Sequence, residues 1–425
     1  MSLLTSNRDF LWLFLGRIVT NIGDSVYYVA AMWLVYDLGG SSFYSGLAGF
    51  LTLLPMALQF VTGPFVDKWP IKRTLVITQI LQSILILIIP FAYTLNLLTV
   101  QLVLVIMPIV SFIEQFAYPS QTKALPILLN DKELIKGNSL FSFAYQGIDL
   151  VFNAVSGILV ATVGAVTLYV ADSITFVIAA LLFASVKLPE KTEQTMGKKG
   201  LKPAFRQYLE DLQEGFSLVF HSLMATFLIG SIACNFAIGA AMAVLPGFAD
   251  SKGGAEIYGF YLAAMSCGSL IGALASPWFG KFAVGRVSIV AFCFGSACWI
   301  ASALIPSVLL GTVLFGIAWL PVGATNVLFA AVVQTVVPNS VLGRINTVSR
   351  SMSVVAMPIG SLAGGYLASI TFPSLIFSCA GAGLLIVSIV WALHPALRRL
   401  PTAEEMNSET FRLNFVSEKQ TAAPK

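Results

Sequence analysis

The sequence predicts an all-α membrane protein with twelve transmembrane helices in two pseudo-symmetric six-helix halves. Three observations support this fold class: the composition, the long uncharged stretches and an internal repeat. Of the 425 residues, 57% are hydrophobic and 10% are charged, whereas soluble domains carry about 25% charged residues. Divided among twelve segments, the hydrophobic residues number about 20 per segment, the length that a membrane-spanning helix requires.

The same composition excludes several other classes of protein. A soluble enzyme or a disordered chain would carry more polar residues, and the net charge of +4 forms no basic stripe for nucleic acid. Continuous apolar runs argue against a β-barrel, whose strands alternate apolar and polar residues. The five cysteines lie in apolar runs, and no Walker A, HExxH or GxGxxG motif occurs. We therefore expect no enzyme activity, no cofactor and no metal site.

Long stretches without charged residues mark the membrane spans. Residues 74–113, 287–343 and 351–397 contain no Asp, Glu, Lys or Arg. Each stretch is long enough for a helical hairpin with a turn near its middle. The twelve helices are expected at residues 10–37, 43–66, 74–94, 99–118, 138–163, 166–187, 222–248, 256–279, 287–305, 308–337, 347–370 and 373–394.

The distribution of basic residues predicts the orientation of the chain. With the N-terminus placed in the cytoplasm, 21 of the 24 Lys and Arg residues fall in inner segments, and only Lys252 falls in an outer loop. Arg17 and Arg350 lie within spans. Because inner loops carry the excess of basic residues, both termini are expected in the cytoplasm and the chain in the cytoplasmic membrane.

The longest polar stretch divides the chain into its predicted domains. Residues 1–187 form the N-terminal six-helix half and residues 216–397 the C-terminal six-helix half. Between them, residues 188–215 form a cytoplasmic linker with an amphipathic helix, which lies either on the membrane surface or against the inner ends of the spans. Residues 398–425 are polar and are expected to form a disordered cytoplasmic tail.

An internal repeat supports the division into halves. The loops after the second and eighth spans, residues 63–73 and 276–286, align without a gap. A duplicated six-helix unit is typical of a transporter whose halves rock around a central site. Pro, Lys and Arg coincide in the two loops at Pro64 and Pro277, Lys68 and Lys281, and Arg73 and Arg286.

The loop at residues 63–73 carries the motif of a known family. It resembles the loop G-x-x-x-D-R/K-x-G-R-R/K between helices 2 and 3 of the major facilitator superfamily, with Pro70 where a glycine is usual. The resemblance implies a conformational latch, in which the acidic residue engages the N-terminus of helix 11 when the inner side is closed. The latch residues would be Gly63, Asp67, Lys68, Lys72 and Arg73.

Other stretches are similar to one branch of this superfamily. Residues 15–24, 124–126 with 137–140, and 172–176 resemble the drug:proton antiporter branch that contains macrolide efflux proteins and an enterobactin exporter. The resemblance implies the major facilitator fold and transport by alternating access. The fourth helix departs from the family, because residues 109–115 lack the arginine that is linked there to proton coupling.

Polar residues inside the spans are the candidate functional residues, because an ionised side chain at the bilayer centre costs about 2.5–3.5 kcal/mol. All the intramembrane acids belong to the N-terminal half. Asp172 is expected near the outer end of its helix, where a helix-terminus role is favoured. A structural polar network is the alternative for the others. The candidates for proton coupling or substrate contact are Asp24, Glu114, Asp149, Arg17, Asn21 and Asn153.

Large side chains at helical spacing are candidates for lining an apolar cavity. Core packing or contact with lipid is the alternative interpretation for each of them, because the same spacing serves all three roles. The six candidates are Tyr28, Tyr258, Tyr261, Met265, Phe329 and Met357.

Together these features predict a secondary active transporter that works by proton-coupled efflux of amphipathic small molecules, such as drugs or macrolide-like compounds. Such a multidrug antiporter would confer antibiotic resistance. Export of a specific metabolite such as a siderophore, or transport of a lysolipid, is the alternative, and a non-transporting membrane receptor is a remote one. The expected partners are a small-molecule substrate, protons and the lipid bilayer, without nucleic acid, and the chain is expected to be monomeric.

Overall fold

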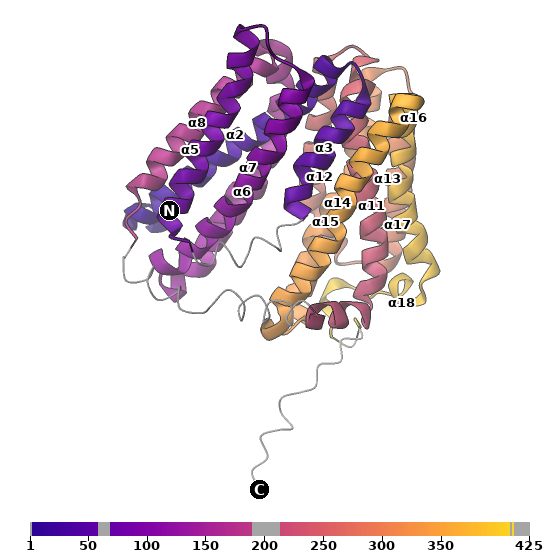
Figure 1. The fold of residues 1–425 in the computed structure, drawn as a ribbon. Helices are drawn as coiled ribbons and strands as arrows, with labels where there is room; N and C mark the ends of the chain where they lie inside the picture. The colour runs from indigo at the N-terminus through magenta and orange to yellow at the C-terminus, as the bar shows by residue number, and fades with distance from the viewer. Residues whose placement is uncertain (1, 58–68, 189–212, 409, 412–425) are drawn as a thin grey trace.

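The computed structural model describes residues 2–57, 69–188, 213–408 and 410–411. Within these ranges every regular element is a helix, which confirms the predicted all-α class, while the count of twelve spans stays a prediction. Ten helical segments of the described chain are long and apolar enough to cross a membrane. The helices stand in two groups, one from each half of the sequence (Figure 1).

Side-chain hydrogen bonds cap the first turns of two helices in the N-terminal half. The Asn7 side chain accepts a hydrogen bond from the Phe10 amide at the start of α2, and Thr99 does the same for Leu102 at the start of α6. Gly40 follows α2 with a φ of 64°, which glycine adopts without strain. The described helices of this half are α1 (Ser2–Ser6), α2 (Arg8–Gly39), α3 (Ser42–Ala57), α5 (Ile71–Thr94), α6 (Val100–Leu128), α7 (Asp131–Val163) and α8 (Ala165–Ser185).

The C-terminal half contains one interrupted helix. The last predicted span is divided at Gly381, whose carbonyl accepts a hydrogen bond from the Ser296 hydroxyl, while the Trp299 indole donates to the Phe377 carbonyl. The elements of this half are α11 (Met224–Asp250), α12 (Ala255–Phe279), α13 (Val284–Leu304), α14 (Val308–Val336), α15 (Asn339–Ile370), α16 (Pro373–Ala380), α17 (Ala382–Leu393), α18 (Pro395–Arg398) and the 3₁₀ helix η2 (Ala403–Glu405).

Three helices extend seven or more residues beyond their predicted spans. α6 continues to Leu128, α7 begins at Asp131 and α15 begins at Asn339. At the start of α7 the Asn130 backbone amide donates to the Glu133 carboxylate at 3.3 Å, which is half of a capping box. Polar residues therefore continue these helices past the apolar segment, and hydropathy alone does not detect such extensions. The second predicted span, expected to end at residue 66, is described only as far as Ala57.

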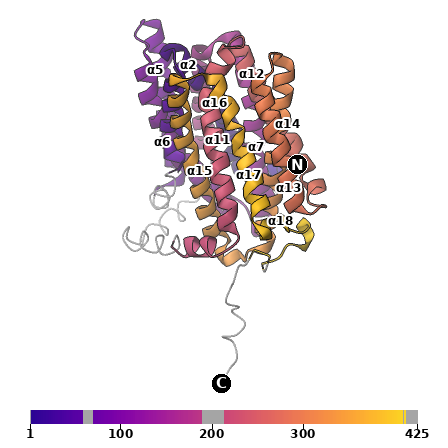
Figure 2. The ribbon, with the colours of Figure 1, turned by 90° about the vertical axis from the view of Figure 1, so that its right-hand side faces the viewer.

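The start of α2 and the end of α17 distinguish the two ends of the helical bundle. α2 begins and α17 finishes at the same end of the bundle, which we call the terminal end; the other end is the opposite end (Figures 1 and 2). Within the halves α2 packs on α8 and α12 packs on α14. Between the halves α3 packs on α15 and α7 packs on α12.

Glycines bring the two halves into backbone contact near the opposite end. A Cβ atom at Gly46 of α3 would lie 2.6 Å from the Gly365 Cα of α15, and one at Gly157 of α7 would lie 2.0 Å from the Gly259 Cα of α12. Gly46 and Gly259 are near the starts of their helices, and Gly157 and Gly365 are near the ends of theirs. All four glycines therefore belong to the opposite end.

Side chains add further contacts between the halves at the opposite end. The Tyr36 hydroxyl donates to Asp250 Oδ2 at 3.0 Å, and the rings of Trp33 and Tyr258 stack with centroids 5.6 Å apart. The Ser45 hydroxyl of α3 donates to the Ala243 carbonyl of α11 at 2.6 Å. The halves are thus joined at the opposite end, and their ribbons diverge toward the terminal end (Figure 1).

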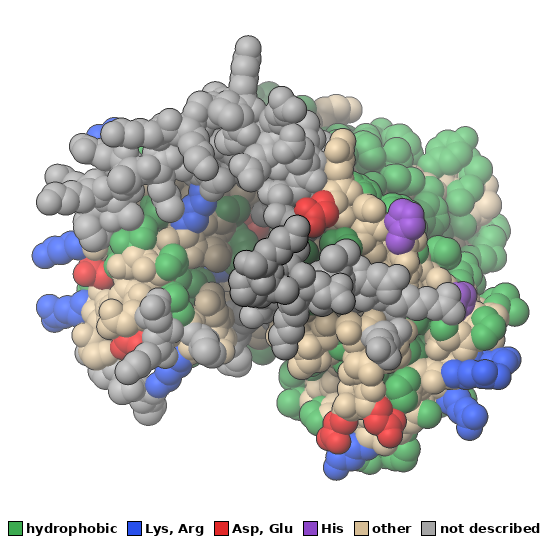
Figure 3. Space-filling view, turned by 90° about the horizontal axis from the view of Figure 1, so that it is seen from below, with side chains coloured by type: hydrophobic (Ala, Val, Ile, Leu, Met, Phe, Trp, Pro, Cys, Tyr) green, Lys and Arg blue, Asp and Glu red, His purple; other side chains and the backbone are tan. Residues whose placement is uncertain are grey.

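The terminal end carries many of the basic side chains. Seen from this end, Lys and Arg side chains lie at the periphery of both halves (Figure 3). They include residues at the starts or ends of α2, α5, α8, α12, α13 and α18, namely Arg8, Lys72, Arg73, Lys187, Lys281, Arg286 and Arg398. At the opposite end Lys252 is the basic residue among those described.

Part of the tail packs against the C-terminal half, which corrects the expectation of disorder for residues 398–408 and 410–411. The Ala403 amide donates to the Gly280 carbonyl at 2.9 Å, and the Leu223 amide donates to the Phe411 carbonyl at 2.9 Å. The apolar side chains of Leu397, Leu400, Met406 and Phe411 are buried. Their burial stabilises a segment whose overall composition is polar. Of the predicted linker, only residues 213–215 are described, and they are helical.

Candidate functional site

Three carboxyl groups of the N-terminal half lie within electrostatic range of one tyrosine, and one of them is fully buried. Asp172 is the eighth residue of α8, 1% exposed, and Oδ1 accepts a hydrogen bond from the Thr175 hydroxyl at 3.1 Å. A Cβ atom at Gly23 of α2 would lie 2.2 Å from this oxygen. Because Gly23 has no side chain, Asp172 reaches the backbone of α2 beside Asp24. Asp172 is therefore an interior residue, about two turns inside α8, that contacts α2.

The side chain of Tyr27 on α2 is a shared neighbour of these acids. The side chains of Asp172, Glu114 and Asp24 all lie close enough to interact electrostatically with the Tyr27 hydroxyl. The ring of Tyr27 packs edge-on against Tyr169 of α8, with centroids 5.4 Å apart. We call Asp24, Glu114, Asp172 and Tyr27 the carboxyl cluster. It joins α2, α6 and α8 in one polar site.

Arg17 and Asn21 lie below the carboxyl cluster, toward the terminal end of α2. Arg17 is 1% exposed, and its guanidinium carbon is 4.9 Å from the ring centroid of Tyr118 on α6. At that distance the cation attracts the face of the aromatic ring. The Asn21 amide donates to the Ala144 carbonyl of α7 at 2.7 Å. Both side chains therefore connect α2 to neighbouring helices.

The remaining polar candidates fall into two groups. Asp149 and Asn153 belong to α7, but their side chains lie outside the described residues. In the predicted latch, Gly63, Asp67 and Lys68 also lie outside the described residues. Lys72 and Arg73, in contrast, stand in the first turn of α5 at the terminal end.

A further set of buried polar residues was not predicted. The Thr20 hydroxyl donates to Gln79 Oε1 at 3.1 Å, and the Gln79 amide donates to Gln82 Oε1 at 3.1 Å. Beside them the hydroxyls of Ser83 and Ser173 lie 2.8 Å apart. The spacing of Gln79, Gln82 and Ser83 on one face of an uncharged helix was the available signal. This polar row connects α2, α5 and α8, and Ser173 follows Asp172 directly.

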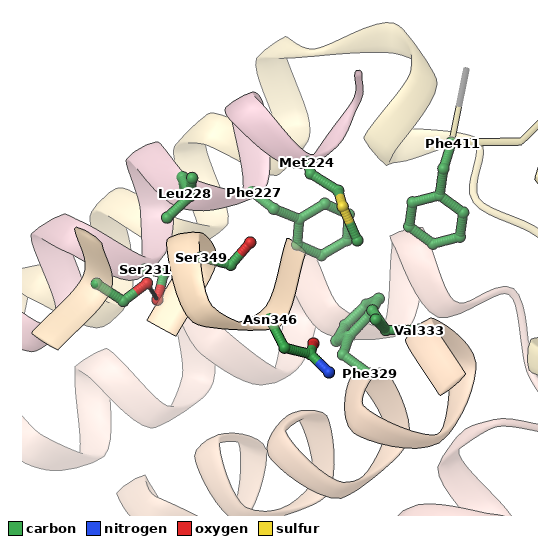
Figure 4. A pocket seen from close by; sticks show the side chains of 10 residues that line it. Met224, Phe227, Leu228, Ser231, Phe329, Val333, Asn346, Ser349 and Phe411 are labelled. Atoms are coloured by element: carbon green, nitrogen blue, oxygen red, sulfur yellow. Dashed lines mark hydrogen bonds between the residues drawn. The ribbon is translucent and has the colours of Figure 1, made fainter. Parts of the chain in front are cut away.

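The C-terminal half contains two adjoining cavities toward the terminal end. One of about 180 Å³ lies between α11, α14, α15 and the tail, and one of about 260 Å³ lies between α11, α13, α14 and α17. Phe227, Ser231 and Phe329 line both of them. Figure 4 shows the first cavity, with Phe411 of the tail at its edge. None of the lining residues is charged.

The predicted cavity-lining residues do not line a single common cavity. Phe329 lines both cavities of the C-terminal half. Tyr261 is fully buried against Phe248, 5.2 Å between centroids, and belongs to the core. Tyr258 is buried against Trp33 at the junction of the halves.

The other three candidates are only partly buried. Tyr28 and Met265 pack against the main apolar core. The backbone of Met357 on α15 lies very close to α11, since a Cβ atom at Gly239 of α11 would be 2.1 Å from the Met357 carbonyl oxygen. Among the described residues, no group of three or more His, Cys, Asp or Glu side chains is arranged to hold a metal ion.

Comparison with known sequences gives the relatives of the chain. It is 25% identical to the MFS-type transporter YvqJ of Bacillus subtilis, over 89% of this chain and 92% of that one. It is 20% identical to the multidrug efflux pump Tap of Mycolicibacterium fortuitum, over 94% and 99% of the two chains. It is 27% identical to the enterobactin exporter EntS of Shigella boydii, over 92% and 93%.

Structural comparison agrees with the sequence relatives on the fold. The nucleoside transporter NupG superimposes with a TM-score of 0.67 at 13% identity, covering 90% of this chain and 98% of its own. The family model described as transmembrane secretion effector matches residues 4–422. The chain therefore belongs to the transmembrane secretion effector family of major facilitator superfamily transporters.

Proposed function

We propose that the chain exports amphipathic small molecules in exchange for protons, from the cytoplasmic membrane and with its terminal end in the cytoplasm. The observation that carries this proposal is the carboxyl cluster: three acids, of which Asp172 is fully buried, in one half of a transporter whose other half has uncharged cavities. Ionising a buried carboxyl group is costly, so such a group can hold a proton until its surroundings change. Release of that proton would drive export.

Within the cluster, the two aspartates have different surroundings. Asp172 is 1% exposed, and its Oδ2 has no hydrogen-bond partner among the described residues. Asp24 directly follows Gly23, the residue that Asp172 contacts, and is only partly buried. We assign proton uptake and release to this pair. Arg17 and Asn21 would position α2 against its neighbours. Glu114, Asp149 and Asn153 remain candidates for substrate contact or for further proton transfer.

The transport cycle would use the junction at the opposite end. With the halves joined there, a substrate would enter from the terminal end. The basic residues at that end support its placement in the cytoplasm, because cytoplasmic loops carry the excess of Lys and Arg. In the second state the glycine contacts would separate. The latch of Gly63, Asp67, Lys68, Lys72 and Arg73 would then hold the terminal end closed.

The direct test uses cells that lack their own drug pumps. Expression of the chain should lower the accumulation of ethidium, a cationic aromatic dye, and a protonophore should restore accumulation to the level of cells without the protein. ATP depletion under conditions that preserve the proton gradient should have no effect. Efflux that survives collapse of the gradient but fails on ATP depletion would contradict proton coupling.

Export of one specific metabolite is the second candidate function. The similarity to enterobactin exporters over 92% of the chain favours it, and a staphyloferrin A transporter of Staphylococcus aureus is 25% identical over 67% of the chain. This candidate predicts that expression restores siderophore release in a host without its own exporter and leaves ethidium accumulation unchanged. Broad dye efflux without siderophore release would contradict it.

A further inference from the structure

The C-terminal tail reaches a cavity that is separate from the junction of the halves. Phe411 is 2% exposed, and its carbonyl accepts the Leu223 amide hydrogen bond described above. Its ring stacks on Phe227 of α11, with centroids 6.2 Å apart and planes at 26°. In Figure 4 this ring stands at the edge of the cavity, across from Phe329 and Asn346. The tail thus supplies one wall.

Aromatic rings form the apolar side of this cavity and of the larger cavity that adjoins it. Phe227 contacts Phe329 at 4.6 Å and Trp391 at 4.9 Å between centroids, both edge-to-face. Together with Phe411 these side chains come from α11, α14, α17 and the tail. Edge-to-face and offset contacts are the arrangements that aromatic rings prefer. A further ring in the cavity would find both ring faces and ring edges to contact.

Hydroxyl and amide groups form the polar side. Asn346, Ser349 and Ser353 are spaced three and four residues apart on α15 and all line the cavity. The Ser231 hydroxyl donates to Ser353 Oγ at 3.0 Å. Ser349 Oγ is buried and has no hydrogen-bond partner among the described residues. Because a buried hydroxyl without a partner is costly, a ligand with one hydrogen-bonding group would be stabilised here.

We propose that these two adjoining cavities form a binding site for a neutral aromatic molecule of one or two rings with a hydrogen-bonding substituent, and that Phe411 closes the site. Cavities of about 180 and 260 Å³ exceed the size that holds benzene, about 150 Å³. The uncharged lining offers no counter-charge to an ionic ligand. Binding at this site does not require transport, so its test is independent of proton coupling.

Cys234 provides a reporter inside the site. It is buried and lines the larger cavity, whereas Cys379 on α16 is exposed. The unsubstituted protein, purified in lipid nanodiscs, is treated with N-ethylmaleimide, and mass spectrometry of its peptides follows both cysteines in the same sample. The probe is 2-naphthol, which is neutral at pH 7. At ten times its Kd it should slow the labelling of Cys234 about tenfold and leave Cys379 unchanged.

Two comparisons make the test specific. Naphthalene-2-sulfonate has the same ring system with a negative charge and should give no protection. Phe411→Ala should weaken the affinity for 2-naphthol roughly two- to tenfold, the loss expected for one aromatic contact, and should reduce the protection of Cys234 accordingly. Phe282→Ala, which removes an exposed ring outside the cavity, should leave it unchanged.

Several results would overturn the proposal. Equal slowing at Cys234 and Cys379 would show general partitioning of 2-naphthol into the bilayer. Equal protection by the sulfonate would contradict a neutral ligand, and unchanged protection in Phe411→Ala would remove the tail from the site. If 2-naphthol at any soluble concentration leaves Cys234 labelling unaltered, the cavity does not bind such molecules.

Discussion

Replacing Gly157 by alanine should destabilise the state in which the two halves are closed at the opposite end. The added Cβ atom would lie 2.0 Å from the Gly259 Cα and 2.8 Å from its backbone nitrogen. Both neighbours are backbone atoms, so no change of rotamer relieves the clash. Gly157 packs across the junction between the halves, and alanine is a better helix former than glycine. The N-terminal half should therefore still fold.

The size of the effect follows from the geometry. Non-bonded carbon atoms prefer separations of about 3.5–4.0 Å, so α7 and α12 must move apart by about 1.5–2 Å. Overpacking of this kind costs about 1–3 kcal/mol. That cost corresponds to a roughly 5- to 150-fold shift of population away from the state closed at the opposite end. Tyr258, the neighbour of Gly259, would lose its stacking contact with Trp33.

The shift can be measured with two spin labels at the opposite end. Asp37 of α2 and Glu256 of α12 are exposed there and belong to different halves; cysteines at these positions, in a chain without the native cysteines, would carry the labels. Gly157→Ala should add a population at longer distance. Gly230→Ala is the matched control, because its Cβ atom would meet neighbours at an ordinary 3.7 Å. An unchanged distance distribution in folded Gly157→Ala would refute the reasoning.

Three further substitutions test the junction and the carboxyl cluster. Tyr36→Phe removes the 3.0 Å hydrogen bond to Asp250, worth about 0.5–1.5 kcal/mol, and should increase the longer-distance population measured with the same labels; no increase would mean that the bond does not hold the junction. Asp172→Asn should reduce protonophore-sensitive ethidium efflux to the level of cells without the protein, at normal expression, because the amide cannot titrate; wild-type efflux would exclude Asp172 from coupling. Gly23→Ala places a Cβ atom 2.2 Å from Asp172 Oδ1 and Thr175 Oγ1. It should lower efflux and should lower stability by about 1–3 kcal/mol, as measured by a thermal melt in detergent. An unaltered melt would show that α8 moves away from α2 without loss of stability.

Much of the fold was predictable from the sequence, because long uncharged runs have few structural solutions in a bilayer. The helix from residue 308 was expected to end at 337 and ends at Val336. The confinement of the intramembrane acids to one half was also visible in the sequence. What periodicity could not supply was the approach of α8 to α2. That approach depends on Gly23 lying opposite Asp172, and a single sequence does not reveal which small residue faces which acid.

The tail was the main error of the sequence interpretation. Leu400, Met406 and Phe411 follow neither a helical nor a strand period, so a polar segment with scattered apolar residues was interpreted as disordered. Their burial depends on surfaces supplied by residues far away in sequence, such as Gly280 and the start of α11. The junction at the opposite end was missed for a similar reason, because the four glycines that form it look like ordinary small residues within apolar helices.

Proton movement by the purified protein tests the central claim most directly. The protein is reconstituted in liposomes that enclose a pH-sensitive dye, and an ethidium gradient is imposed with the membrane potential clamped. The account predicts that ethidium flux through the protein moves protons in the opposite direction, and that Asp172→Asn and Asp24→Asn abolish this proton movement. Ethidium flux without any proton movement in the unsubstituted protein, or proton movement that persists at the same rate in both variants, would contradict the account.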